Sequence, residues 1–166
     1  FSGLAVAFAF KAGLFNIGAQ GQLLVGAVVA AFIGFSIEGL PAIIHVPLAL
    51  LVGGLAGALY GFIPGALKAY TGAHEVIVTI MLNYVAINLT DWLADGPWQD
   101  PSPTNIVART QAIFHSAELL VIGIIPTGFI LALVVAVIVW SLLYRTTFGH
   151  ELRPVGPNAS ADQFAG

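Results

Sequence analysis

The chain has 166 residues, of which 58% are hydrophobic and 8% are charged, and its formal net charge is −3. This composition excludes an ordinary soluble domain and predicts an integral membrane protein. The small, dispersed charge gives no reason to expect nucleic acid or a polybasic lipid-binding surface. Because the chain has no cysteine, it offers neither a disulfide framework nor a thiolate metal site.

Uncharged runs long enough to cross a membrane follow one another along the chain. No charge occurs between Lys11 and Glu38, in residues 39–67 or in residues 119–144, so each run can span a bilayer as a helix. Residues 76–90 form a shorter run that needs its polar flanks to span. The sequence therefore predicts an all-α fold, a polytopic bundle of transmembrane helices.

The chain begins within an apolar stretch, at Phe1, and residues 1–10 are expected to be the end of a further span. Its single methionine is Met81, so no natural start is visible. We therefore expect the chain to be a fragment of a longer protein.

Basic residues orient the spans, because lysine and arginine concentrate in short cytoplasmic loops. The inner side is marked by Lys68, Arg145 and Arg153. Residues 36–47 then form one outer turn, residues 94–118 a longer outer loop, and residues 145–166 a cytoplasmic segment. We predict that residues 1–166 form one partial transmembrane domain that includes this outer loop and this cytoplasmic segment.

Glycine recurs at every fourth position in the run that begins at Ala49. The series is Gly53, Gly57, Gly61 and Gly65. Such spacing places small residues along one face of a helix, where a second helix can approach closely. We predict a packing face here, although glycine is also common in membrane helices in general.

A polar strip follows one face of the run from residue 75 to residue 90. This face carries Glu75, Thr79, Asn83 and Thr90, with the small Ala86 between them. Asn88 points the other way. Hydrocarbon cannot satisfy such groups, so the strip faces another helix or water. Two interpretations stay open. The strip joins helices, or Thr79 and Asn83 border a solute path while Glu75 forms a structural pair near the cytoplasmic end.

A second polar segment joins three amides to two glycines at membrane depth. The amides are Asn16, Gln20 and Gln22, and the glycines are Gly18 and Gly21. The helix is expected to be broken or tightly packed here, and a broken helix exposes backbone dipoles that suit polar solutes. The amides therefore line a path or satisfy backbone groups at a close helix crossing.

Motifs for metal or nucleotide chemistry do not occur. The histidines are scattered, at His45, His74, His115 and His150, without the spacing of a metal site. No phosphate-binding GxxxxGK[ST] loop is present. We predict that this chain binds no cofactor and is not an enzyme, so any ATP hydrolysis belongs to a partner.

Three stretches together resemble a known family. They are GLFNIGAQGQ, LKAYTGAHEVIVTIMLNYVA and RTTFGHELRPVGPNASADQFAG, and they are similar to permease subunits of bacterial ABC importers of the branched-chain amino acid and simple-sugar superfamily. The nearest branch is that of nucleoside or simple-sugar (guanosine-type) permeases. Because members commonly have about ten spans, the resemblance implies that helices are missing from both ends.

The resemblance assigns the last stretch to a cytoplasmic loop that docks on the ATPase. The matching residues are Gly149, Glu151, Arg153, Gly156 and Asn158. The sequence departs from the family pattern at Pro154, Pro157 and Ala159. By composition alone, the same stretch would equally be a solvated loop.

The function implied is ATP-driven import of nucleosides or simple sugars across the bacterial inner membrane. The implied partners are an ABC ATPase that binds ATP and Mg²⁺, a second permease subunit, an extracytoplasmic solute-binding protein and membrane lipid. The predicted path residues are Asn16, Gln20, Gln22, Thr79 and Asn83. The alternative is a secondary transporter or channel in which Glu75 or His74 relays protons. A membrane enzyme is a third and weaker interpretation.

Overall fold

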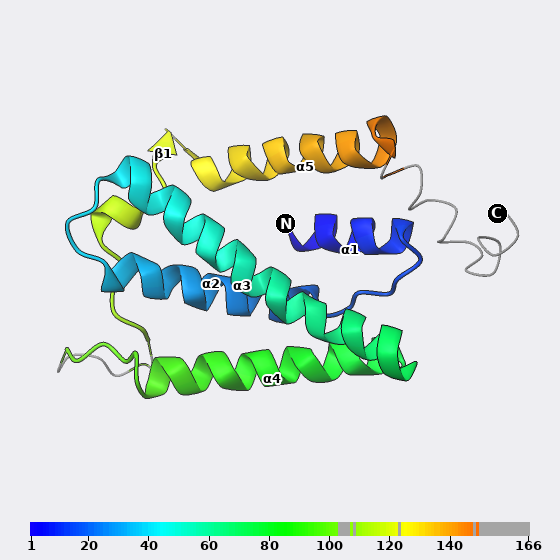
Figure 1. Cartoon of the computed structure of the whole chain (residues 1–166). Helices are drawn as coiled ribbons and strands as arrows, with labels where there is room; N and C mark the ends of the chain where they lie inside the picture. The colour runs from blue at the N-terminus through cyan, green and yellow to red at the C-terminus, as the bar shows by residue number, and fades with distance from the viewer. Residues whose placement is uncertain (103–106, 108, 123, 148, 150–166) are drawn as a thin grey trace, which may run out of the picture. The chain divides into compact units, whose positions relative to one another are not determined.

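The computed structural model describes residues 1–102, 107, 109–122, 124–147 and 149. Its helices are α1 (Ser2–Lys11), α2 (Ala19–Ser36), α3 (Ala42–Thr71), α4 (Glu75–Asp95), the 3₁₀ turn η1 (His115–Ala117) and α5 (Thr127–Arg145). Two strands of two residues each, β1 (Val121–Ile122) and β2 (Ile125–Pro126), form a short antiparallel hairpin. The predicted all-α class is confirmed, with this hairpin as a local addition (Figure 1).

Helices α2, α3, α4 and α5 are each long and apolar enough to cross a membrane, whereas α1 is shorter. Each overlaps one of the predicted uncharged runs, but α2 and α5 begin several residues later than the runs at residues 12–37 and 119–144. The run at residues 76–90 is extended by its polar flanks into the 21-residue α4. Helix α3 has 30 residues. At about 1.5 Å per residue it exceeds the hydrocarbon thickness of about 30 Å, so its ends reach the interfacial region.

The chain folds into two compact units, unit 1 with residues 1–19 and 120–166, and unit 2 with residues 20–119. In the described part of unit 1, α1 packs against α5. The β1–β2 hairpin leads into α5, and its register pairs Ile122 with Ile125. The backbone N–H of Thr127, the first residue of α5, donates to the Leu120 carbonyl at 3.1 Å. The hairpin thus fixes the point at which α5 begins.

Unit 2 contains α2, α3, α4 and the segment after α4. Figure 1 shows α3 running obliquely across α2. The chain turns from α3 into α4 at Gly72, which has a positive φ of 68° and donates its N–H to the Lys68 carbonyl at 3.0 Å. A side chain with a Cβ disfavours that conformation, which explains glycine at this helix end.

The segment after α4 is tied down at several points. The Trp98 ring stacks on Phe32 of α2 with centroids 4.6 Å apart. An isolated bridge pairs Gln99 with Thr110, and the Arg109 guanidinium pairs with the Asp100 carboxylate at 2.9 Å. The described residues of this loop are therefore held by contacts with α2 and with one another. Its placement outside the membrane stays a prediction.

Candidate functional site

Helices α2 and α3 cross with their backbones in close contact. A Cβ built on Gly53 would lie 2.6 Å from the Gly26 carbonyl oxygen and 2.8 Å from Ala30 Cβ. A Cβ on Gly57 would lie 2.9 Å from the Gln22 carbonyl oxygen. Because real Cβ atoms do not approach so closely, both positions require glycine as long as the two backbones keep this separation.

Within the described structure, the close contact of α3 with α2 extends as far as Gly61 and not to Gly65. At Gly61 a Cβ would still meet the Gln22 side-chain amide at 3.1 Å. At Gly65, however, no atom of the described structure lies within 4 Å of that place. The close contact with α2 thus involves Gly53, Gly57 and Gly61, and the part of Gly65 in a packing face stays a prediction. Sequence analysis also missed the partner glycine on α2, Gly26, whose own Cβ would lie 2.9 Å from the Gly53 carbonyl oxygen.

Helix α2 begins inside the predicted broken segment. Residues 12–18 separate α1 from α2, so residues 16–18 of the predicted segment are not helical, whereas residues 19–22 are the first turn of α2. The first N–H groups of any helix lack intrahelical partners. One of them, the N–H of Gly21, donates at 2.8 Å to the side-chain oxygen of Asn83 on α4. Asn83 therefore acts as a cap supplied by another helix.

Gly21 leaves no room for a side chain beneath this cap. A Cβ there would lie 2.9 Å from the Asn83 side-chain oxygen and 3.2 Å from Ala86 Cβ. Ala86 is itself fully buried. The α2–α4 contact thus combines one hydrogen bond with close packing of small residues, as expected where lipid cannot satisfy a helix end.

The other polar groups of α4 also meet protein. Thr79 is 3% exposed, and its hydroxyl donates to the Val76 carbonyl of the same helix at 3.1 Å. The Tyr60 hydroxyl of α3 donates to the Leu82 carbonyl at 2.7 Å and so joins α3 to α4. The sequence did not predict this contact, because it does not show which carbonyl a tyrosine reaches.

Glu75 opens α4 and forms an ion pair with Lys68 near the end of α3. The Glu75 side chain is 11% exposed and that of Lys68 is 42% exposed. Each charge also lies at the helix end where its sign is favourable, an acid in a first turn and a base in a last turn. The contact closes the corner formed by the two helices. His74, the other residue of the proton-relay alternative, is exposed.

The five predicted path residues lie in different settings. Gln20 is exposed, whereas Gln22 is half-buried and packs against α3. Thr79 and Asn83 make the contacts described above, within unit 2. Asn16 belongs to unit 1. The hydrogen bond between Gly21 of α2 and Asn83 of α4 supports the helix-joining interpretation of the polar strip, whereas the bond of Thr79 stays within α4.

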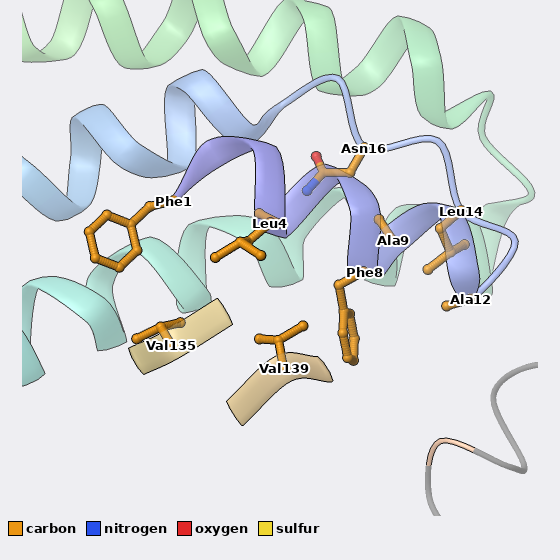
Figure 2. Close-up of a pocket in the computed structure, with 10 residues that line it drawn as sticks. Phe1, Leu4, Phe8, Ala9, Ala12, Leu14, Asn16, Val135 and Val139 are labelled. Carbon is orange, nitrogen blue, oxygen red and sulfur yellow. The ribbon is translucent and has the colours of Figure 1, made fainter. Parts of the chain in front are cut away.

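Asn16 lines a cavity of about 410 Å³ in unit 1, which sequence analysis did not predict. Figure 2 shows α1 contributing Leu4 and Phe8 to it and α5 contributing Val135 and Val139. Of the described residues that line it, Asn16 alone has a polar side chain. Such an apolar wall suits hydrocarbon or an aromatic ring better than a sugar, which needs many hydrogen bonds.

Of the predicted ATPase-docking residues, the structure describes Gly149 alone. Its N–H donates to the Thr146 hydroxyl at 3.3 Å, just after α5. The other four, Glu151, Arg153, Gly156 and Asn158, lie outside the described residues. Their role stays a prediction.

Helices of this length and apolarity, joined by glycine crossings and interhelical hydrogen bonds, define a polytopic membrane protein of the kind that packs several spans around polar contacts. Over residues 1–166 the chain matches the family described as branched-chain amino acid transport system / permease component. The chain belongs to this family. It is accordingly a multi-pass protein of the inner (plasma) membrane.

Several relatives are similar along nearly the whole chain. The guanosine ABC transporter permease protein NupP of Bacillus subtilis is 48% identical over 99% of this chain and 48% of its own length. The nucleoside ABC transporter permease protein NupB of Lactococcus lactis is 34% identical over 98% of this chain and 47% of its own. The glucose ABC transporter permease protein TsgB13 of Haloferax volcanii is 34% identical over 99% of this chain and 46% of its own length.

The chain thus spans about half the length of the relatives it matches. No solved structure matches it significantly. The family settles the class of protein, a permease component, and the relatives give no support to the secondary-transporter alternative.

Proposed function

We propose that the chain is part of the transmembrane permease subunit of an ATP-driven importer of nucleosides or simple sugars. The observation that carries this proposal is the 48% identity to a permease named for guanosine across 99% of the chain. Relatives named for nucleosides and for glucose support a neutral, polar, hydroxyl-rich solute.

The permease would supply the path and not the chemistry. ATP and Mg²⁺ would bind a separate ABC ATPase, and residues 145–166 would dock on it through Gly149, Glu151, Arg153, Gly156 and Asn158. A second permease subunit would complete the path, and an extracytoplasmic binding protein would deliver the solute. This division agrees with the relatives, which are named as permease proteins.

Within unit 2, we place the solute path beside the start of α2. Gln20 is exposed there, and Gln22 is one residue beyond the capped Gly21. Both amides offer a donor and an acceptor to a hydroxyl-bearing solute. Asn83 would hold this helix end in place, and Thr79 would support it from α4. Asn16, which belongs to unit 1, stays a predicted path residue.

Reconstitution tests the proposal directly. The full-length permease, placed in liposomes with its ATPase and binding protein, should take up radiolabelled guanosine or glucose only when ATP is supplied on the ATPase side. Competition by unlabelled nucleosides and sugars then identifies the solute. Uptake driven by a proton or solute gradient without the ATPase would overturn the proposal.

ATPase docking is tested separately by capture. The double variant Arg153→Glu with Glu151→Arg in the full-length permease should retain less ATPase on an affinity matrix than the unsubstituted protein. Exchange of Lys68 with Glu75, a pair remote in sequence from the docking segment, serves as the control. Unchanged capture by the first variant would refute the docking role.

A further inference from the structure

His45 is a buried, titratable side chain that the proposed function does not use. It lies in the first turns of α3 and is 0% exposed, the largest fully buried side chain in the described structure. A polar ring so placed is costly unless both nitrogens find partners.

Both ring nitrogens are bonded to elements other than α3. Nε2 lies 3.1 Å from the Ile33 carbonyl oxygen of α2, and Nδ1 lies 2.8 Å from the Ser116 hydroxyl of η1. A carbonyl only accepts, so Nε2 carries the proton, and in the neutral ring Nδ1 accepts from the Ser116 hydroxyl. One imidazole thus connects three elements.

The bond to Ile33 has a reason in helix geometry. Helix α2 ends at Ser36, so Ile33 is among the last four residues, whose carbonyls have no intrahelical partner. The next such carbonyl, that of Gly34, accepts from the Phe114 N–H at 2.9 Å. A Cβ on Gly34 would lie 2.9 Å from Ile113 Cγ2. The end of α2 is therefore completed by α3 and by the segment around η1.

We infer that His45 is a positioning residue that locks residues 109–119 onto the ends of α2 and α3, so that the three move as one rigid body. The chain just before these residues is restrained as well, because Trp98 stacks on Phe32 and Asp100 pairs with Arg109. The segment is thus a fixed part of unit 2 and not a lid. Only the consequence for transport rests on the proposed function.

Hydrogen–deuterium exchange of the full-length permease in nanodiscs tests the lock. His45→Leu removes both bonds and should raise exchange of the amides at residues 113–117 on the order of tenfold, while peptides of α4 keep their protection. His45→Gln retains one donor and one acceptor and should restore much of the protection. Ser116→Ala should give a smaller rise.

The matched control is His115→Leu. This histidine is next to Ser116, its side chain is 99% exposed and its bond is to Glu118, so its loss should leave exchange at residues 113–117 unchanged. Equal exchange in His45→Leu and His115→Leu would overturn the inference. If His45→Leu does not fold, Ser116→Ala is the test. Unaltered exchange at residues 113–117 in Ser116→Ala would then overturn the inference.

A distance measurement tests the rigid body. The 166 residues contain no cysteine, so Ile43→Cys and His115→Cys introduce label sites at positions that are strongly exposed. The spin–spin distance should be one narrow distribution, identical with and without ATP and the ATPase. A shift or broadening on ATP binding would overturn the inference. If the unsubstituted protein shows no ATP-driven uptake, the proposed function fails while the exchange results still stand.

Discussion

Two helix contacts of similar apolar composition are built in different ways. Where α3 crosses α2, glycines let the backbones touch. Helix α4 is held to its neighbours by two hydrogen bonds, one that Asn83 accepts from Gly21 and one that Tyr60 donates to the Leu82 carbonyl. Where α1 meets α5, side chains such as Phe8 and Val139 meet across an open cavity of about 410 Å³. The first contact depends on particular residues at particular places, and the second depends on apolar bulk.

The difference matters because lipid is as apolar as leucine. Helices in a membrane gain little from burying aliphatic side chains against one another, so close backbone contact and hydrogen bonds decide where they pair. We therefore expect substitutions at the α2–α3–α4 contacts to cost much more than substitutions beside the α1–α5 cavity.

The largest effect is expected for Gly53→Ala. Its new methyl would lie 2.6 Å from the Gly26 carbonyl oxygen, so the helices must separate, at a cost of about 1–3 kcal/mol. Gly54→Ala is the matched control, because nothing in the described structure lies within 4 Å of its Cβ. It should be neutral or stabilising by up to about 1 kcal/mol, since alanine favours a helix over glycine. Thermal unfolding of the full-length protein in detergent measures both, and equal shifts would contradict the close crossing.

Asn83→Leu should rank second. It leaves the Gly21 N–H without this acceptor, at a cost of about 1–2 kcal/mol. Asn83→Asp keeps an acceptor oxygen and should retain more stability. The control is Asn88→Leu on the exposed side of α4, where the amide donates to the Tyr84 carbonyl at 2.8 Å. Unfolding midpoints should fall for Asn83→Leu and change little for Asn88→Leu, and the reverse order would contradict the cap.

A smaller effect is expected at the α3–α4 corner. Glu75→Gln removes the ion pair with Lys68, and because the lysine side chain is 42% exposed the loss should be only about 0.5 kcal/mol. Combining Lys68→Glu with Glu75→Lys restores a pair, although it reverses both favourable helix-end charges. The double variant should recover part of the stability lost by Lys68→Glu alone. No recovery would mean that the pair contributes nothing measurable.

The smallest effect is expected beside the cavity. Val139→Leu adds one methylene where the cavity of about 410 Å³ has room for it, so stability should change by less than about 0.5 kcal/mol. The same unfolding measurement checks this. A loss as large as that of Gly53→Ala would show that α1 and α5 are packed as tightly as α2 and α3.

Charge and hydropathy were sufficient to predict the spans, because a helix in a membrane must be long and apolar whatever it packs against. Amides and glycines gather in residues 16–22, and the non-helical residues 12–18 overlap the first part of that segment. The polar strip of α4 was predicted from helical periodicity, and Thr79 and Ala86 are indeed buried there.

Partners could not be predicted, because they lie far apart along the chain. Gly21 and Asn83 are 62 positions apart, and His45 and Ser116 are 71 positions apart. The glycine series predicted a packing face but not which of its glycines meet α2. Gly65 has the same spacing as Gly61, yet no atom of the described structure lies within 4 Å of its Cβ position. Which helix crosses at a glycine is a property of the assembled helices.

The sequence by itself determined that this chain is a bundle of membrane-spanning helices, because the membrane imposes the same length and apolarity on every span. Its motifs placed it in a permease family. Only the tertiary structure decided what the buried amides and His45 do. A buried donor or acceptor takes whichever partner the fold brings within about 3 Å, and for Asn83 and His45 that partner lies on another helix or on η1.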